Sequence, residues 1–289
     1  MPEGRCKLTG KLGRFVKCHI IPEAVTRAER KGAHLVQFGT GKPTRRWTSW
    51  YDPELVTAQG EGILARYDSW AIAQLRRHKL IWSSWGSSQA LAADDFRPFP
   101  PSPWGLRSIR NFDTAKLRLF YLSVLWRVAA TNLPEFAQIQ LPNEEIDQLR
   151  TMLLEGSIEP LTFYPISLIQ ISTRGTAHNR PPVSQTKRLV EPEENVPIVR
   201  IYFDGLIAHL HGASEHASRA IELGPIIIGN EDRMTINTVA YEDSSQRAAL
   251  IIDVAGAYAD WPEDMARKVE LEEILGEGHQ SVRRRNQRN

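Results

Sequence analysis

The stretch from Asp113 to Asn132, DTAKLRLFYLSVLWRVAATN, constrains the fold more than any other part of the chain. Its apolar residues recur at intervals of three and four, at Leu117, Phe120, Tyr121, Val124, Leu125 and Val128. This spacing puts them on one face of an α-helix. Asp113 has the side chain of a helix N-cap. The stretch therefore predicts an amphipathic helix that packs against a core.

Helices and strands are expected in different parts of the chain. A second helix is predicted from about Ile63 to Lys79, where LRRHK is a cationic end that suits the helix dipole. A third begins after Asn143. Beyond Gly156 the period changes, and strands are predicted at 162–172, 198–212, 224–230, 233–241 and 249–256. Asp204-Gly205 is typical of a two-residue hairpin turn.

The remaining stretches predict a chain in two folded parts. Residues 6–21 are predicted to form a hairpin and 22–32 a short helix, whereas 173–197 and 281–289 have the composition of an exposed loop and a frayed tail. Residues 93–110 are rich in proline and are predicted to connect the parts. The expected fold is α+β, with an N-terminal ββα-like unit (1–92), this connector, and a helical plus antiparallel β-rich domain (111–289).

Composition excludes several classes of protein. The 289 residues contain no unbroken apolar run that could span a bilayer. The N-terminus lacks the apolar core of a secretory signal, so we expect a cytoplasmic protein without membrane contact. Cys6 and Cys18 are the only cysteines, which excludes a disulfide framework and a four-thiolate zinc site.

Charge is distributed unevenly along the chain. Residues 1–120 carry twenty Lys and Arg against ten Asp and Glu, a net +10, and the rest of the chain carries a net −8. This asymmetry is typical of a protein whose basic part binds a polyanion, with the acidic part free to dock a protein partner. The alternative is that the two parts neutralise each other within the fold.

The N-terminal hairpin ends in Cys18-His19-Ile20-Ile21-Pro22, after Cys6-Lys7-Leu8-Thr9. This arrangement resembles the first half of the HNH nuclease motif, the ββα-metal fold, over about residues 3–80. With Leu122-Ser123-Val124-Leu125-Trp126-Arg127, the chain also resembles uncharacterised bacterial proteins that share an SHIIP-type start, over about 155 residues. It departs from the family at Thr9, which stands in the place of a second cysteine, and at Cys18, where an acidic ligand often stands.

The resemblance implies a metal-dependent nuclease that hydrolyses phosphodiester bonds, with DNA favoured over RNA and a role in defence against phage or mobile elements. His19 would be the general base. Asp68, Glu61 and Cys18 would hold Mg²⁺ or Mn²⁺, with Zn²⁺ less favoured. Asp68 has an alternative role, because a basic neighbour such as Arg66 could pair with it structurally.

Several cations and one aromatic residue are candidates for nucleic-acid contacts: Arg14, Lys17, Arg45, Arg46, Trp47, Arg76, Arg77 and Lys79. The second functional hypothesis is a descendant without catalytic activity, which binds nucleic acid or a protein within a larger assembly. His209 and His211 alternate along a predicted strand, a pattern of a transition-metal site or of a solvated strand face. Ser123 and Arg127 are interpreted as internal hydrogen-bonding residues.

Overall fold

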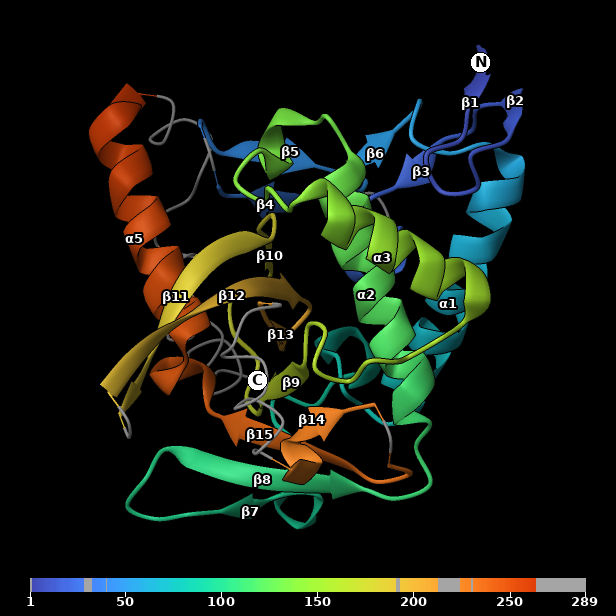
Figure 1. The fold of residues 1–289 in the computed structure, drawn as a ribbon. Helices are drawn as coiled ribbons and strands as arrows, with labels where there is room; N and C mark the ends of the chain where they lie inside the picture. Colours follow the sequence, from blue (N-terminus) through green and yellow to red (C-terminus); the bar gives the residue numbers. More distant parts are fainter. Residues whose placement is uncertain are drawn as a thin grey trace.

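A computed structural model describes residues 2–28, 33–39, 41–190, 193–212, 224–229 and 231–263. The described part is a mixed α+β fold with four α-helices, arranged around a large mixed sheet (Figure 1). The helices are α1 (Ala58–Arg77), α2 (Thr114–Ala130), α3 (Asn143–Glu155) and α5 (Ser245–Asp260). None of the described helices is long and apolar enough to cross a membrane.

The main sheet has eight strands, in the order β11-β12-β13-β9-β15-β8-β7, with β14 also pairing with β9. Their bounds are β7 Arg97–Pro98, β8 Trp104–Ile109, β9 Ile166–Ile171, β11 Val183–Val190, β12 Glu193–Phe203, β13 Leu206–His211, β14 Ile227–Ile228 and β15 Met234–Val239. β15 runs parallel to β9, so the expectation of an antiparallel C-terminal part is corrected to a mixed sheet.

Small sheets build the N-terminal region. β1 (Glu3–Arg5) pairs with β2 (Leu12–Arg14), and β3 (Cys18–His19) pairs with β6 (Tyr51–Asp52). β4 (Leu35–Gln37) lies between β5 (Thr44–Arg46) and β10 (His178–Asn179). The hairpin expected at residues 6–21 is therefore corrected to one that pairs Glu3–Arg5 with Leu12–Arg14, and His19 belongs to a separate strand pair. Of the predicted helix 22–32, a 3₁₀ turn at Glu23–Val25 is described, and 29–32 lie outside the described residues.

Alternation along the strands divides the sheet into two apolar faces. Leu168, Ile201 and Ala208 belong to a core shared with α1, α2 and α3, whereas Ile169 and Ile207 on the same strands pack with Trp82 on the other face. The β12–β13 turn confirms the hairpin prediction. Asp204 and Gly205 both have positive φ, 51° and 81°, as a tight hairpin turn requires.

The helix predicted from residues 113–132 is confirmed as α2, which contacts both α1 and α3 (Figure 1). The Asp113 side chain accepts a hydrogen bond from the Lys116 amide, as expected of an N-cap. Almost every residue of α2 is buried, including Arg118, Ser123 and Arg127. Three polar residues inside a core require partners, and those of Ser123 and Arg127 determine the site described below.

Two secondary-structure predictions in the C-terminal part were wrong. Residues 173–197, expected to be an exposed loop, contain β10, β11 and the start of β12. Residues 249–256, expected to be a strand, lie in α5, where Leu250, Val254 and Ala257 share one face and pack with Phe38. Leu250, Val254 and Ala257 recur at helical spacing, and the apolar character of so short a run does not by itself distinguish a strand from a helix. The basic tail 281–289 lies outside the described residues.

The proline-rich segment does more than connect two parts. Residues within 93–110 form β7 and β8, and β8 pairs with β15 inside the main sheet. Apolar residues from the N-terminal region, such as Leu64, lie in the same core cluster as Ile201 of the sheet. The N-terminal region and the sheet therefore share a hydrophobic core.

Candidate functional site

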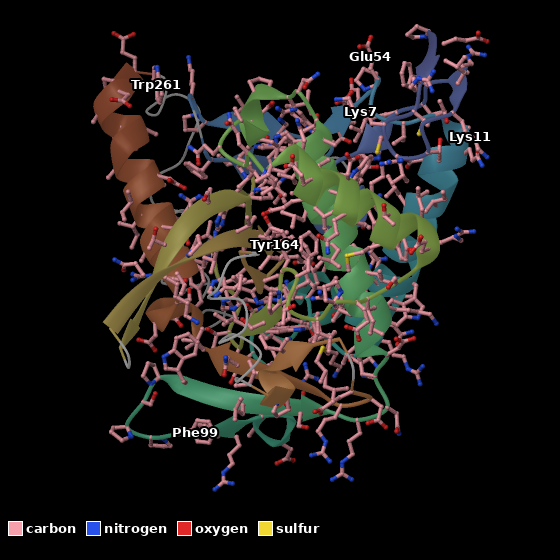
Figure 2. All side chains as sticks on the ribbon, in the orientation of Figure 1. Lys7, Lys11, Glu54, Phe99, Tyr164 and Trp261 are labelled. Atoms are coloured by element: carbon pink, nitrogen blue, oxygen red, sulfur yellow. The ribbon has the colours of Figure 1, made fainter. Side chains whose placement is uncertain are left out.

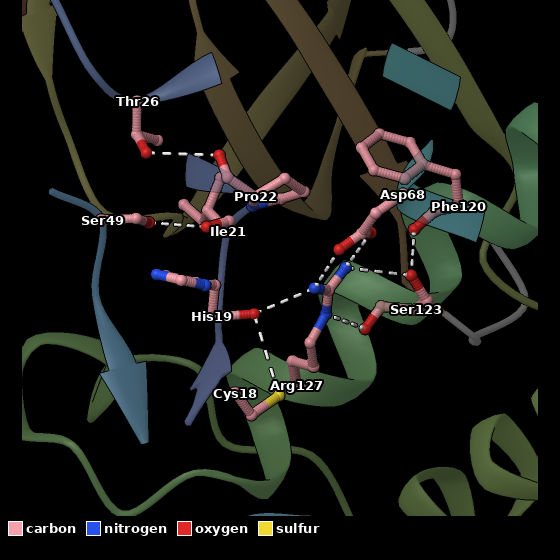
Figure 3. Close-up of polar contacts among 10 residues, drawn as sticks. All are labelled: Cys18, His19, Ile21, Pro22, Thr26, Ser49, Asp68, Phe120, Ser123 and Arg127. Carbon is pink, nitrogen blue, oxygen red and sulfur yellow. Dashed lines mark hydrogen bonds and ion pairs between the residues drawn. The ribbon is translucent and has the colours of Figure 1, made fainter. Parts of the chain in front are cut away.

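The strand pair β3–β6 fixes the position of His19. Cys18 pairs with Asp52 and His19 with Tyr51. The Ile20 amide donates to the Trp50 carbonyl at 2.9 Å, and the Ser49 hydroxyl donates to the Ile21 carbonyl at 2.6 Å (Figure 3). The Cys18 side chain points into the core, and the His19 side chain points toward the surface because side chains alternate along a strand.

The His19 imidazole is partly open to solvent and weakly bound. Its side chain is 24% exposed, and Nε2 lies 4.0 Å from Oε2 of Glu23. Nε2 is itself buried, and it has no hydrogen-bond partner among the described residues. Burial, helped by the nearby Lys17 cation, lowers the pKa of His19 below its usual range. The ring is therefore neutral at neutral pH.

Asp68, the expected metal ligand, binds an arginine instead. Its two carboxylate oxygens accept hydrogen bonds from the Arg127 guanidinium at 2.7 and 2.9 Å (Figure 3). The Asp68 side chain is 17% exposed and that of Arg127 only 1%. In this bidentate, buried ion pair, Arg127 matches the charge of Asp68 and binds both carboxylate oxygens, which a metal ion would require.

The same guanidinium also connects the α2 helix to β3. Arg127 Nη1 donates to the His19 carbonyl at 2.9 Å, and Nε donates to the Ser123 carbonyl at 3.2 Å. The Ser123 hydroxyl in turn donates to the Phe120 carbonyl at 2.7 Å. The interpretation of Ser123 and Arg127 as internal hydrogen-bonding residues is confirmed. Arg127 links β3, α1 and α2 through one side chain.

Glu61 and Cys18 form the neighbouring part of the centre. Because α1 begins at Ala58, Glu61 and Asp68 both lie on it. Burial raises the pKa of Glu61, a hydrogen bond with Cys18 partly offsets this effect, and Oε2 of Glu61 has no partner among the described residues. Burial also raises the pKa of the Cys18 thiol. Both groups are thus shifted toward their protonated forms, which are poor metal ligands.

These residues do not fit a divalent cation. The described residues include no group of three or more His, Cys, Asp or Glu side chains that could hold a metal ion. Asp68 is engaged by Arg127, and the Cys18 thiol favours its protonated form. The structure therefore brings the expected residues Cys18, His19, Glu61 and Asp68 into one region but offers no ligand set there.

The histidines of β13 do not form a metal site in the described structure either. His209 and His211 lie on one face of the strand, and Nε2 of His211 is 3.3 Å from the Ser167 hydroxyl. Burial, with Arg200 as the next cause, lowers the pKa of His209 to about 3, and burial lowers that of His211 to about 4. Both are neutral side chains of the sheet, His211 buried and His209 half-buried.

The cysteine-bearing turn holds its shape through protein contacts. The Cys6 sulfur accepts a hydrogen bond from the Thr9 amide at 3.4 Å, and the Cys6 amide donates to the Lys11 carbonyl at 2.9 Å. The sulfur packs so closely on α1 that a Cβ added at Gly60 would lie 2.7 Å from it. Helix packing thus fills the space beside Cys6 in this turn.

Cations and aromatic rings surround His19 on the outer surface. Arg14 and Lys17 are exposed, and Nζ of Lys17 lies 4.1 Å from the centre of the Tyr51 ring. Tyr51 is 43% exposed, and its ring lies 6.4 Å from that of His19. We call Arg14, Lys17, His19 and Tyr51 the β3–β6 surface. Lys11 of the preceding turn projects at the same end of the molecule (Figure 2).

Sequence reasoning missed Tyr51, whose role depends on pairing opposite His19.

The three candidate residues Arg45, Arg46 and Trp47 have different environments. Trp47 is 60% exposed and contacts the His34 ring at 5.3 Å, and Arg45 is exposed too. Arg46 forms an ion pair with Glu135 at 2.8 Å, so its charge is already matched. The spacing of Arg45, Arg46 and Trp47 along the sequence does not show that their environments differ.

The predicted basic residues of α1 lie at the C-terminal end of the helix, where Nη2 of Arg76 donates to the Ala24 carbonyl at 3.4 Å. Arg76, Arg77 and Lys79 are exposed at the C-terminal end of the helix, whereas Glu61 near its start approaches Cys18. Sixteen residues of helix separate Glu61 from Arg77, a distance of about 24 Å at 1.5 Å per residue. Arg77 therefore lies far from Glu61, whereas Arg76 contacts the 3₁₀ turn that follows β3.

Comparisons with known proteins give no independent identification. No family model, no curated protein and no solved structure matches this chain.

Proposed function

We propose that the chain is a nucleic-acid-binding protein whose N-terminal HNH-like unit has an ion pair where nucleases of that family hold a metal. The observation that carries the proposal is the β3–β6 surface. Lys17 and Arg14 are exposed, and neither has an ion-pair partner in the described part of the chain. Lys17 lies over an exposed tyrosine ring that neighbours the neutral His19 ring, and Arg14 is the last residue of β2, three positions before Lys17. Cations beside an open aromatic ring favour binding to a single-stranded nucleic acid.

Each group of the surface has a definite role in this proposal. Lys17 and Arg14 bind backbone phosphates, which releases counterions and makes the affinity depend on salt. Tyr51 stacks against a base, and the neutral His19 ring beside it adds no charge to the surface. Because the Arg127 side chain is 1% exposed, it cannot reach a phosphate. It instead fixes the position of β3 through its hydrogen bond to the His19 carbonyl.

Fluorescence anisotropy with a labelled single-stranded oligonucleotide tests the proposal over a range of salt concentrations. Lys17→Gln and Arg14→Gln should each reduce the salt slope by about 1. Tyr51→Ala should weaken binding by about 5- to 150-fold, because stacking contributes roughly 1–3 kcal/mol per base. The matched control is Arg110→Gln, an exposed arginine after β8, at the other end of the molecule from β3 (Figure 1).

Equal affinity of the wild type, Lys17→Gln and Tyr51→Ala would contradict the proposal. If the protein prefers duplex DNA and Tyr51→Ala binds as tightly as the wild type, the binding of phosphates by Lys17 and Arg14 is retained. Stacking by Tyr51 is then rejected. An RNA oligonucleotide of the same sequence shows which nucleic acid binds more tightly.

A second candidate is the HNH-like nuclease that the resemblance implies, with a possible role in phage defence. The specific observation in its favour is the neutral His19 imidazole, whose side chain is 24% exposed although its Nε2 is buried. Plasmid nicking with added Mg²⁺ or Mn²⁺ tests this candidate, with His19→Ala as the variant. Equal nicking by both proteins would remove His19 from the chemistry, and no nicking by either would leave the binding function.

A further inference from the structure

We propose that a groove between α1, α2 and the segment after α3 binds an apolar monocarboxylate. The groove has a volume of about 620 Å³. Tyr67 and Trp70 line it from α1, Leu119 lines it from α2, and Ile158 lines it just after the end of α3. We call it the α1–α2 groove. This proposal does not depend on the nucleic-acid proposal, because none of these residues belongs to the β3–β6 surface.

The aromatic walls of the α1–α2 groove are held in place by protein contacts. The Tyr67 hydroxyl donates to the Leu153 carbonyl at 2.7 Å, which joins α1 to α3. The Trp70 ring packs edge-on against the Phe112 ring, with centroids 6.0 Å apart and planes 78° apart. Tyr67 and Trp70 are nevertheless only half-buried. Both rings therefore have fixed positions and still present apolar surface to a ligand.

The spacing of residues along the two helices places cations beside these apolar walls. Arg66 and Trp70 lie four residues apart on α1, and Lys116 and Leu119 lie three residues apart on α2, so each pair shares a helix face. The helices pack against each other (Figure 1). Nζ of Lys116 lies 5.8 Å from the centre of the Trp70 ring. The two faces therefore meet at the groove.

Arg66 supplies the charge that a ligand would meet. It is exposed and lines the groove, and it has no ion pair or hydrogen bond among the residues that the structure describes. Burial raises the pKa of Tyr67, and the Arg66 cation opposes this effect, so the guanidinium lies near the phenol oxygen. A guanidinium binds a carboxylate through two parallel N–H···O hydrogen bonds. Arg66 is therefore suited to the head group of a carboxylate whose apolar body lies on the walls.

The carboxylate of Asp113, which also lines the groove, is matched within the protein. Its Oδ2 lies 3.1 Å from Nζ of Lys116, and its Oδ1 accepts from the Lys116 amide at 2.9 Å. All the lining residues named above lie within residues 41–190, which the structure describes without a gap. Asp113 and Lys116 therefore pair with each other, and the charge of Arg66 remains for a ligand.

The volume indicates the size of the ligand. Small-molecule sites have volumes of about 300–1,000 Å³ and are mostly apolar with a few polar groups, and the 620 Å³ of the α1–α2 groove lies in this range. A carboxylate on an apolar body of about ten carbon atoms belongs to this size class. An acyl chain and a pair of fused aromatic rings both supply such a body.

Titration calorimetry of the full chain tests the proposal with decanoate, 2-naphthoate, their neutral analogues 1-decanol and 2-naphthalenemethanol, and acetate. We expect decanoate or 2-naphthoate to bind and acetate to have no effect. The neutral analogue should bind about ten-fold more weakly or worse, because it lacks the charge that pairs with Arg66. Arg66→Gln should weaken binding of the carboxylate by a similar factor. Ala115→Trp, at a half-buried lining position of α2, should block binding by filling the groove.

Arg97→Gln is the matched control, because it removes an exposed arginine of β7 that does not line the groove. Binding of decanoate identifies an acyl chain as the body of the ligand, and binding of 2-naphthoate identifies fused rings. The proposal is overturned if neither carboxylate binds, if acetate or the neutral analogue binds equally well, or if Arg66→Gln binds like the wild type. Equal weakening by Arg97→Gln would also overturn it. Arg66→Gln keeps the test valid if Ala115→Trp does not fold, since Arg66 is exposed.

Discussion

The ion pair between Asp68 and Arg127 gives the most direct test of this description of the centre. Asp68→Ala leaves the Arg127 guanidinium in place but removes two charge-assisted hydrogen bonds, of 2.7 and 2.9 Å. The remaining partners of Arg127 are the His19 and Ser123 carbonyls and the Ser123 hydroxyl, which carry no full negative charge. A buried cation would then lack its counter-ion.

The expected loss is large because the guanidinium is 1% exposed. Removal of one partner of a buried ion pair costs about 3–5 kcal/mol, since the other charge stays buried without compensation. Apolar residues in both positions cost much less, because no buried charge remains. The double variant Asp68→Leu/Arg127→Met should therefore be more stable than the sum of its single substitutions indicates, by about 2 kcal/mol or more.

Urea unfolding followed by tryptophan fluorescence measures these free energies, with the midpoint and slope fitted separately. The control is Asp147→Ala, which removes an exposed pair with Arg150 at 3.3 Å, and a surface pair contributes only about 0–1 kcal/mol. A loss below about 1 kcal/mol for Asp68→Ala would refute a structural role for the pair. Added Mg²⁺ that stabilises the wild type but not Asp68→Ala would show that Asp68 is a ligand after all.

Further predictions concern single residues. The pKa of His178 is lowered from 6.5 to about 4 by burial, so its stabilising contribution is present above pH 6.5 and is lost as the pH falls toward 4. His178→Gln should remove that part of the pH dependence of unfolding, up to about 1.4 kcal/mol per pH unit. Glu61 has a raised pKa, so its carboxylate form destabilises the fold as the pH rises above 4.5, and Glu61→Gln should stabilise the protein at pH 8. Asp113→Ala removes the α2 cap and should cost about 1 kcal/mol in urea unfolding. Exhaustive treatment with EDTA should leave Tm unchanged, because Gly60 of α1 packs against the Cys6 sulfur and fills the space where a metal would lie. A large decrease in Tm would show that the turn that contains Cys6 holds a metal.

The sequence predicted those helices and turns that are determined by residues close together in the chain. The apolar stripe from Leu117 to Val128 and the cap at Asp113 define α2 without help from the rest of the chain. Asp204-Gly205 defines its turn in the same way, because two adjacent positive φ angles require residues of this kind. In contrast, residues 183–190 are polar in several positions and become a strand because β12 pairs with them along eight residues.

The pairing of side chains from distant segments was the part that the sequence could not supply. A basic partner was expected for Asp68, and Arg66 was the nearest candidate along the chain. Arg66 is exposed, however, and the partner is Arg127, which lies 59 positions away and is brought close by the contact of α1 with α2. Only the crossing of these helices determines which charge meets the carboxylate.

The Arg127 contacts also change how the HNH-like features are interpreted. The resemblance in β3 and the resemblance in α2 are far apart in the sequence, yet the guanidinium of Arg127 binds the carbonyl of His19 directly. The two sequence features are therefore parts of one physical unit, in which α2 orients the strand that carries the imidazole. Arg127→Lys separates orientation from charge, because a lysine keeps the cation but cannot form the bidentate pair and bind β3 together. If nucleic-acid binding by the β3–β6 surface requires this orientation, Arg127→Lys should weaken it although Arg127 itself is buried away from any ligand.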